Sequence, residues 1–161
     1  MLLKFYIVSV GELREKFLTD ALLEYEKRLR SYASLSHIVI REEKLPERPS
    51  QADIRLALKR EGERMLAALP KRAYRVALCV EGTPLSSEAF AAKLNDAAVN
   101  GCSEFAFLIG SSDGLADSVK QAADFSLSFS NMTFPHQLMQ VLLAEQLYRS
   151  MNLLNGGKYH K

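Results

Sequence analysis

The sequence predicts an α/β fold: a mostly parallel sheet with helices on both faces. Short runs rich in apolar and β-branched residues alternate with longer amphipathic segments, which is the order that repeated strand–helix–strand units produce. The first run, residues 4–10, is predominantly apolar and rich in β-forming residues, as expected of a strand that is buried on both faces. A chain of 161 residues suits one domain, so we expect a single domain over residues 1–161.

The first half of the chain contains the clearest helical periodicity. Apolar residues recur at helical spacing over 11–32, with charges opposite them, which predicts an amphipathic helix. A second strand is expected over 36–42. Prolines then predict a loop over 43–50, and Ser50 suits the N-cap of a helix over 51–69. The apolar positions of these two helices are Leu13, Phe17, Ala21, Leu22, Tyr25, Leu29, Ile54, Leu58, Met65 and Leu66.

The second half continues the alternation and ends in an apolar helix. In parallel sheets, ligands bind beyond the carboxyl ends of the strands. A site is therefore expected among the loops near 80–86, 108–117 and 130–137. The predicted elements are strands over 74–82, 103–110 and 125–130, and helices over 83–101, 114–123 and 137–154.

Charge and cysteine content exclude some classes of protein. The net charge is only +2, without the broad basic stripe of a typical nucleic-acid binder, so a polyanion would have to meet local basic clusters. Cys79 and Cys102 show neither metal-site spacing nor a disulfide framework. We expect both to pack in the core in a reducing compartment. The N-terminal segment lacks the pattern of a signal peptide, and we expect a cytoplasmic protein.

Three loops carry candidate chemistry, each with a simpler structural interpretation. Gly110 and Gly114 in "LIGSSDGLAD" permit close backbone approach. They suit a phosphate, a carboxylate or the polar edge of a cofactor, or a plain strand–helix turn. The loop lacks the Lys-Ser/Thr of a Walker A motif. Glu81 and Gly82 fit a surface turn. His136 lies in the first turn of the last helix, where a histidine is more often solvated than catalytic; His37, in a strand, is expected to be structural.

The last helix is apolar on most of its circumference, so it is expected to be buried or to meet a partner subunit. Glu145 and Arg149 form an i,i+4 pair, which is either a surface salt bridge or a means of orienting Arg149. Two glycines then precede a short tail, which is either frayed or folded back. The residues that could stack on bases or meet phosphates are Tyr148, Arg149, Lys158, Tyr159, His160 and Lys161.

The segments "FPHQLMQVLLAEQLYRS", "LIG…DGL" and "YHK", with "VSVG" and "EGERML" earlier, resemble the ribosomal RNA large subunit methyltransferase H family over the whole chain. These are SPOUT-class methyltransferases that use S-adenosylmethionine. The resemblance implies a SPOUT-type α/β fold with a C-terminal trefoil knot, the knot and cofactor loops spanning about residues 74–161. It also implies a homodimer that methylates N3 of a pseudouridine in 23S rRNA on the assembled ribosome.

The resemblance also implies roles for individual residues. Glu81 and Gly82 would border the cofactor pocket. The methyl group is already activated on sulfonium, so no metal is implied. Arg149 would stabilise the developing base anion, and His160 or Tyr159 would relay the proton. The implied catalytic or RNA-facing residues are His136, Arg149, Tyr159 and His160. The implied cofactor-binding residues are Leu78, Gly110, Ser111, Ser130, Asn131, Met132, Thr133, Phe134 and Pro135.

The sequence departs from the family pattern in two places. The loop is "GSSDG" where G-G-P-E-G is usual, and the tail "GGKYHK" lacks a His and a Pro. Ser111 is therefore expected to be strained by a positive φ, and cofactor binding to be weaker. This motivates an alternative, a non-catalytic ribosome- or RNA-binding dimer of the same fold. A phosphate-binding α/β enzyme using the same loop is a third possibility, but the chain has no Walker lysine.

Overall fold

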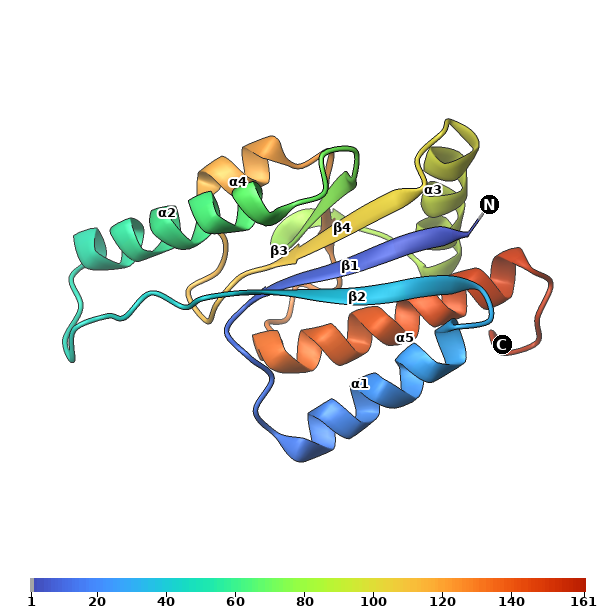
Figure 1. Cartoon of the computed structure of the whole chain (residues 1–161), viewed down its shortest axis with the longest axis horizontal. Coiled ribbons are helices and arrows are strands. Elements are labelled where there is room, and N and C mark those ends of the chain that lie inside the picture. The colour runs from blue at the N-terminus through green and yellow to red at the C-terminus, as the bar shows by residue number, and fades with distance from the viewer. Residues whose placement is uncertain (1) are drawn as a thin grey trace.

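The computed structural model describes residues 2–161, which form one five-stranded sheet in the order β2-β1-β4-β3-β5 (Figure 1). Every neighbouring pair of strands is parallel, as the sequence predicts. The elements are β1 (Leu3–Val10), α1 (Lys16–Leu29), β2 (Ala33–Ile40), α2 (Gln51–Ala68), β3 (Tyr74–Pro84), α3 (Ser87–Val99), β4 (Glu104–Ile109), α4 (Asp117–Ala122), β5 (Phe125–Ser128) and α5 (His136–Leu154).

Helices cover both faces of the sheet, with α1 and α5 on one side and α2 and α4 on the other (Figure 1). The core accordingly divides into two clusters. Phe5, Phe105 and Phe107 pack beneath α1, α3 and α5. Val8 and Leu108 pack against α2 and α4. All five side chains are fully buried, which explains why the central strands β1 and β4 are mostly apolar on both faces rather than alternating.

The helix α1 starts later than predicted and packs most of the predicted apolar positions, including Leu22 and Leu29, against the core. Gly11, at φ +77°, ends the first strand, and the helix begins only at Lys16. Leu18, Leu22 and Leu29 are buried, whereas Phe17 is 68% exposed. The expectation that Phe17 belongs to the core face was wrong. Successive helical positions point about 100° apart, and the row through Leu18 is the one that packs inward.

The helix α5 is covered mainly by its own chain. It packs between α1 and α3, and Leu143, Ala144 and Leu147 are fully buried. This explains most of the apolar circumference without a second subunit. One row remains only partly buried, and it consists of Leu138, Leu142, Glu145 and Arg149.

The helix α2 begins as predicted and lies close to α4. Ser50 and Asp53 form a complete capping box. Gly62 faces α4 so closely that an added Cβ would lie 2.9 Å from Val119 Cγ2. The close packing fixes α4, which follows the glycine loop after β4. Within residues 2–161, no helix combines the length and the hydropathy that crossing a bilayer requires.

Glu61 should make the stability of the fold depend on pH. Its carboxylate accepts the Glu43 N–H at 2.9 Å and the residue is only 5% exposed. Burial raises the pKa of this carboxyl. The Glu61 carboxyl therefore binds its proton more tightly in the folded state than in the unfolded state. Because the pKa of this group in the unfolded chain is about 4.3, the free energy of unfolding falls as the pH rises from that value through the higher pKa of the folded state.

We expect the variant Glu61→Gln, which keeps an oxygen acceptor but cannot ionise, to gain stability relative to the wild type as the pH rises above the unfolded pKa of about 4.3. Urea unfolding at several pH values measures the difference. The exposed neighbour Glu63 supplies the control, Glu63→Gln. Parallel pH dependences for wild type and Glu61→Gln would contradict the assignment.

Candidate functional site

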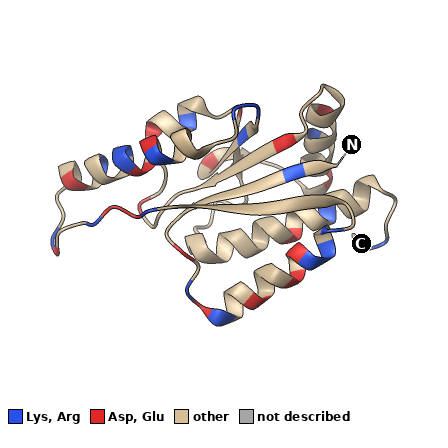
Figure 2. Cartoon of the chain, viewed as in Figure 1, with Lys and Arg blue, Asp and Glu red and all other residues tan. Residues whose placement is uncertain are grey.

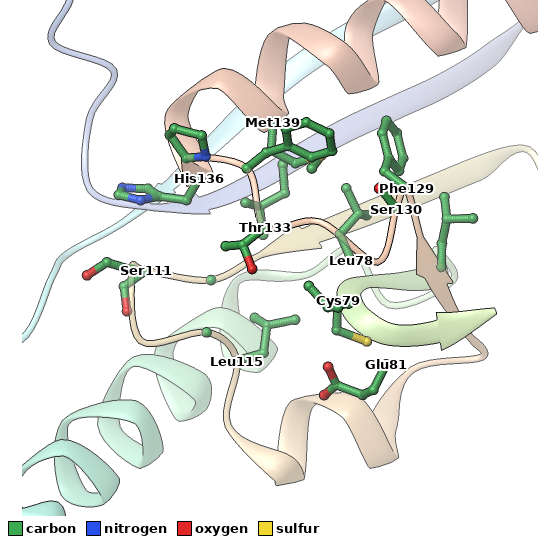
Figure 3. Close-up of a pocket in the computed structure, with 18 of the residues that line it drawn as sticks. Leu78, Cys79, Glu81, Ser111, Leu115, Phe129, Ser130, Thr133, His136 and Met139 are labelled. Carbon is green, nitrogen blue, oxygen red and sulfur yellow. The ribbon is translucent and has the colours of Figure 1, made fainter. Parts of the chain in front are cut away.

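The carboxyl ends of β3, β4 and β5 and the start of α5 enclose a cavity of about 480 Å³ (Figure 3). Its walls are mostly apolar, and they include Leu78, Ile109, Leu115, Leu127 and Phe129. Volume and lining match the usual character of a small-molecule site, which is apolar with a few polar groups. The cavity lies where the parallel sheet is expected to hold a ligand.

A bulge in β3 forms one wall of this cavity. Both Leu78 and Thr83 lie opposite Leu127 of β5, so the four residues between them leave the regular ladder. Gly82 allows the bulge to close, because a Cβ there would lie 2.8 Å from the backbone of Ser126 and Leu127. The bulge directs Cys79, Val80 and Glu81 to the cavity. Cys79 was expected in the core, and that expectation was wrong.

The glycine loop after β4 forms the opposite wall. A Cβ on Gly110 would overlap the carbonyl of Gly114, so only glycine fits at this position. Gly114 has φ +90° and donates its N–H to the Ser111 carbonyl at 2.9 Å. Within residues 2–161, positive φ values occur only at glycines, so the strain expected at Ser111 is absent. The turn places its left-handed residue at Gly114 instead, and "GSSDG" closes without strain.

The structure brings most of the predicted cofactor residues to the cavity. The exception is Asn131, which is exposed and does not line it. Sequence reasoning missed the apolar walls Leu115, Leu127 and Phe129 and also Met139, which lies one turn after His136 on α5. The helical spacing from His136 was the available signal for Met139. The predicted residues that line the cavity are Leu78, Gly110, Ser111, Ser130, Met132, Thr133, Phe134, Pro135 and His136.

An ion pair joins two sides of the rim. Lys120 of α4 donates to the Glu81 carboxylate of the β3 bulge. The contact lowers the pKa of Glu81 and raises that of Lys120. Both groups are therefore charged at neutral pH. Within residues 2–161, His, Cys, Asp and Glu form no group of three or more that could hold a metal ion.

The tail does not fray but folds back onto α5. Gly156, at φ +70°, ends the helix, and a Cβ on Gly157 would overlap the Asn152 side chain. The side-chain oxygen Oδ1 of Asn152 then accepts a hydrogen bond from the Tyr159 backbone N–H at 3.0 Å. Both glycines are thus required for the return of the chain.

The returning tail forms a polar cluster around Glu145, which we call the tail cluster: Glu88, Glu145, Arg149, Tyr159 and His160. Arg149 donates to the Glu145 carboxylate from Nε at 2.9 Å and also from Nη2, and its guanidinium lies 4.6 Å over the Tyr159 ring. The Tyr159 hydroxyl donates to the same carboxylate at 3.1 Å. The i,i+4 pair is therefore part of a network rather than an isolated surface salt bridge.

His160 links this network to α3. Arg149 Nη1 lies 3.1 Å from His160 Nδ1, and because a guanidinium only donates, Nδ1 accepts. Nε2 then carries the proton and donates to Glu88 Oε1 at 2.7 Å. The pKa of Glu88 is lowered by its own backbone N–H and by His160. This pairing defines one tautomer of neutral His160.

Arg149 and Tyr159 of the tail cluster have shifted pKa values. Hydrogen bonding to Glu145 raises the pKa of Arg149. Burial, followed by the charge of Glu145, raises the pKa of Tyr159. Tyr159 is therefore a hydrogen-bond donor at neutral pH and a poor base.

Within one chain, Arg149, Tyr159 and His160 of the tail cluster do not line the cavity, whereas Glu145 lines a second, smaller cavity of about 230 Å³ that shares Leu127, Phe129 and Phe134 with it. His136 begins α5 at the cavity, and Arg149 follows 13 residues later on the same helix. A rise of 1.5 Å per residue separates them by about 20 Å, and Figure 1 shows the C-terminus at the far end of α5. Of the four implied catalytic residues, only His136 lies at the cavity. His37 lies elsewhere, on β2, 3.7 Å from Glu26.

We expect Gly110→Ala to weaken binding of S-adenosylmethionine. The added methyl group displaces the Gly114 carbonyl, and overpacking of this kind costs about 1–3 kcal/mol, equivalent to roughly 10- to 100-fold in affinity. Titration calorimetry measures the loss. Gly101→Ala is the control, because Gly101 has φ +99° but open space around it. It should lower stability without changing affinity; equal affinities for Gly110→Ala and wild type would contradict the account.

Comparison with known proteins identifies the family. A family model described as "Predicted SPOUT methyltransferase" matches residues 3–160. The chain is 47% identical over 155 residues to the ribosomal RNA large subunit methyltransferase H of Shouchella clausii, and 45% identical over 155 residues to the protein of that name from an Exiguobacterium species. Each alignment covers 96% of this chain and 98% of the relative.

Solved structures show the same fold at low sequence identity. A probable methyltransferase from Bordetella pertussis superposes with a TM-score of 0.56 at 13% identity, covering 93% of this chain and 96% of that one. The tRNA (m1G37) methyltransferase of Aquifex aeolicus gives 0.53 at 10% identity, covering 100% and 75%. With the fold in agreement and the family model matching nearly the whole sequence, this chain belongs to the SPOUT methyltransferase family.

Proposed function

We propose that this protein is an S-adenosylmethionine-dependent methyltransferase that methylates N3 of a pseudouridine in 23S rRNA, in the cytoplasm on the assembled ribosome. The observation that carries the proposal is the apolar cavity at the carboxyl ends of β3, β4 and β5, in a chain 47% identical to a ribosomal RNA large subunit methyltransferase H. The unstrained glycine loop removes the structural motive for the non-catalytic alternative.

The residues around the cavity fit the methyl donor. Leu78, Leu115 and Phe129 offer apolar walls to the adenine ring. Backbone groups of the glycine loop and of residues 130–135 offer hydrogen bonds to the polar ends of the molecule, because loop backbone outside helix and sheet retains free donors and acceptors. When bound, S-adenosylmethionine supplies a methyl group that sulfonium already activates. The remaining task of the protein is to place the acceptor base in line with it.

The tail cluster is suited to an acceptor that loses a proton. The contacts described occupy three of the five N–H donors of Arg149, and the other two can meet a base oxygen as negative charge develops at N3. Tyr159 can donate a hydrogen bond but, with its raised pKa, is a poor base. His160 is left as the acceptor of the N3 proton, and it can accept only at Nδ1, after the hydrogen bond from Arg149 Nη1 is released; Glu88 keeps its contact with the protonated Nε2.

The active unit in this proposal is a homodimer in which the tail of one chain reaches the cavity of the other. The separation of about 20 Å along α5 supports it, because one chain alone cannot bring Arg149 to the cavity. Apolar side chains remain for an interface: Leu138 and Leu142 are partly exposed on α5, and Phe17 is 68% and Leu23 53% exposed on α1.

We further infer one domain over residues 1–161 with a trefoil knot in the part from about 74 to 161. Family membership supports the knot, and the continuous sheet of five strands supports the single domain. A knot would bring the three cavity loops together through threading as well as through hydrogen bonds.

The direct test is methyl transfer from labelled S-adenosylmethionine to ribosomes that lack the modification, followed by mass mapping of the labelled nucleotide. The proposal expects label at N3 of a pseudouridine of 23S rRNA. Label in another RNA, or none with folded protein and competent ribosomes, would contradict it.

We expect Arg149→Ala to reduce methyl transfer by at least about 100-fold, the loss typical of removing one donor to a developing anion. Affinity for S-adenosylmethionine should stay within twofold of wild type, because Arg149 does not line the cavity. Arg72→Ala, at an exposed turn residue, is the matched control and should transfer normally. Retained turnover in Arg149→Ala would remove this residue from the mechanism.

A further inference from the structure

Several unpaired cations lie in one segment of the surface. In and just after α1, Lys16, Arg28 and Arg30 each lie within 4.0 Å of an acid four residues away. Between residues 41 and 59, by contrast, five exposed cations have no acidic partner within 4.0 Å among residues 2–161. We call residues 41–59 the basic arm, and its unpaired cations are Arg41, Lys44, Arg48, Arg55 and Lys59.

The acids of the basic arm are partly neutralised by other contacts. Glu43 is bound by Arg60 at 3.0 Å and by Arg64 at 2.6 Å. The Asp53 carboxylate accepts the Ser50 N–H and hydroxyl, each at 2.8 Å. Glu42, Glu47 and Asp53 are left without a cationic partner against the five cations, so the arm presents a modest excess of positive charge.

The basic arm lies at the edge of the sheet where the cavity opens. It leaves the carboxyl end of β2 and continues into the first half of α2, and both extend beyond the sheet (Figure 1). Lysines and arginines recur along loop and helix, interspersed with acidic residues (Figure 2). Leu58 of this helix half lines a small cavity together with Gly114 and Leu115, and those two residues also line the large cavity. The arm is therefore adjacent to the glycine loop.

We propose that the basic arm binds the phosphate backbone of the RNA that flanks the methylated nucleotide. The inference rests on the proposed function and assigns its RNA-docking surface. Cations that lack an acidic partner can meet phosphates without breaking an ion pair, and each contact gains free energy by releasing condensed counterions. Phosphate contacts position a protein without reading sequence. The arm thus supplies affinity and orientation, whereas the cavity and tail supply the chemistry.

Paired charge-removal variants test the proposal. Arg55→Gln with Lys59→Gln removes two unpaired cations of the arm. Lys71→Gln with Arg72→Gln removes two exposed cations just after α2 that also lack acidic partners among residues 2–161 but lie at the opposite edge, where β3 starts. Ribosome binding is measured by filtration over a series of salt concentrations, with the full-length protein.

The arm variant is expected to flatten the slope of log K against log salt by about 1.4–1.8, since each lost phosphate contact contributes roughly 0.7–0.9. Its affinity at about 0.1 M salt should fall roughly tenfold, while S-adenosylmethionine affinity and transfer at saturating ribosomes stay within twofold. The control variant should keep the wild-type slope. Equal slopes for arm and control variants would overturn the proposal.

Hydroxyl-radical footprinting then identifies the partner of the arm. The expected result is backbone protection of 23S rRNA by wild type that the arm variant loses at specific nucleotides. An unchanged footprint would assign the arm to an acidic ribosomal protein and overturn the proposal. Failure of the proposed reaction is a separate result. An arm-dependent footprint without methyl transfer would support the RNA-docking surface and contradict the reaction. Normal methyl transfer without any dependence on the arm would support the reaction and contradict the docking surface.

Discussion

The contact between Gly110 and the carbonyl of Gly114 determines the shape of the carboxyl edge of the sheet. It has no room for a Cβ, so the chain turns sharply after β4 and leaves Leu115 at the cavity wall. Gly82 plays the matching part in β3, where the bulge lies against the backbone of Ser126 and Leu127. Two close backbone contacts that only glycine permits thus fix the positions of the loops that line the cavity.

Glu145 has a comparable place at the other end of α5. Its carboxylate accepts from Arg149, Tyr159 and Gln146, and its side chain is only 15% exposed. An acid so enclosed is stabilised by its donors, and removal of any one of them leaves charge unsatisfied. The cluster therefore orders a tail that would otherwise fray, and it holds Arg149 and His160 in fixed positions.

The sequence predicted the alternation of strands and helices, the parallel sheet and the loops that form the cavity, because these follow from local periodicity and from a general rule about parallel strands. It could not predict that Cys79 faces the cavity, since the β3 bulge depends on pairing with a strand almost 50 residues away. Ser111 was misjudged because the family pattern gave no backbone angles. Phe17 was misjudged because Phe17 and Leu18 are adjacent apolar residues about 100° apart around α1. The periodicity alone does not decide which of the two faces the core.

The central claim is that the cavity of one chain works with the tail of another. The most direct measurement combines two impaired variants, Gly110→Ala, with a weakened cavity, and Arg149→Ala, with an impaired tail cluster, by co-expression and purification of the mixed dimer, assayed at an S-adenosylmethionine concentration that does not saturate Gly110→Ala. One intact cavity then faces one intact tail, so the account predicts that the mixed dimer recovers about half of the wild-type methyl transfer. A mixed dimer as impaired as its parents would show that each chain serves its own cavity and would contradict the account.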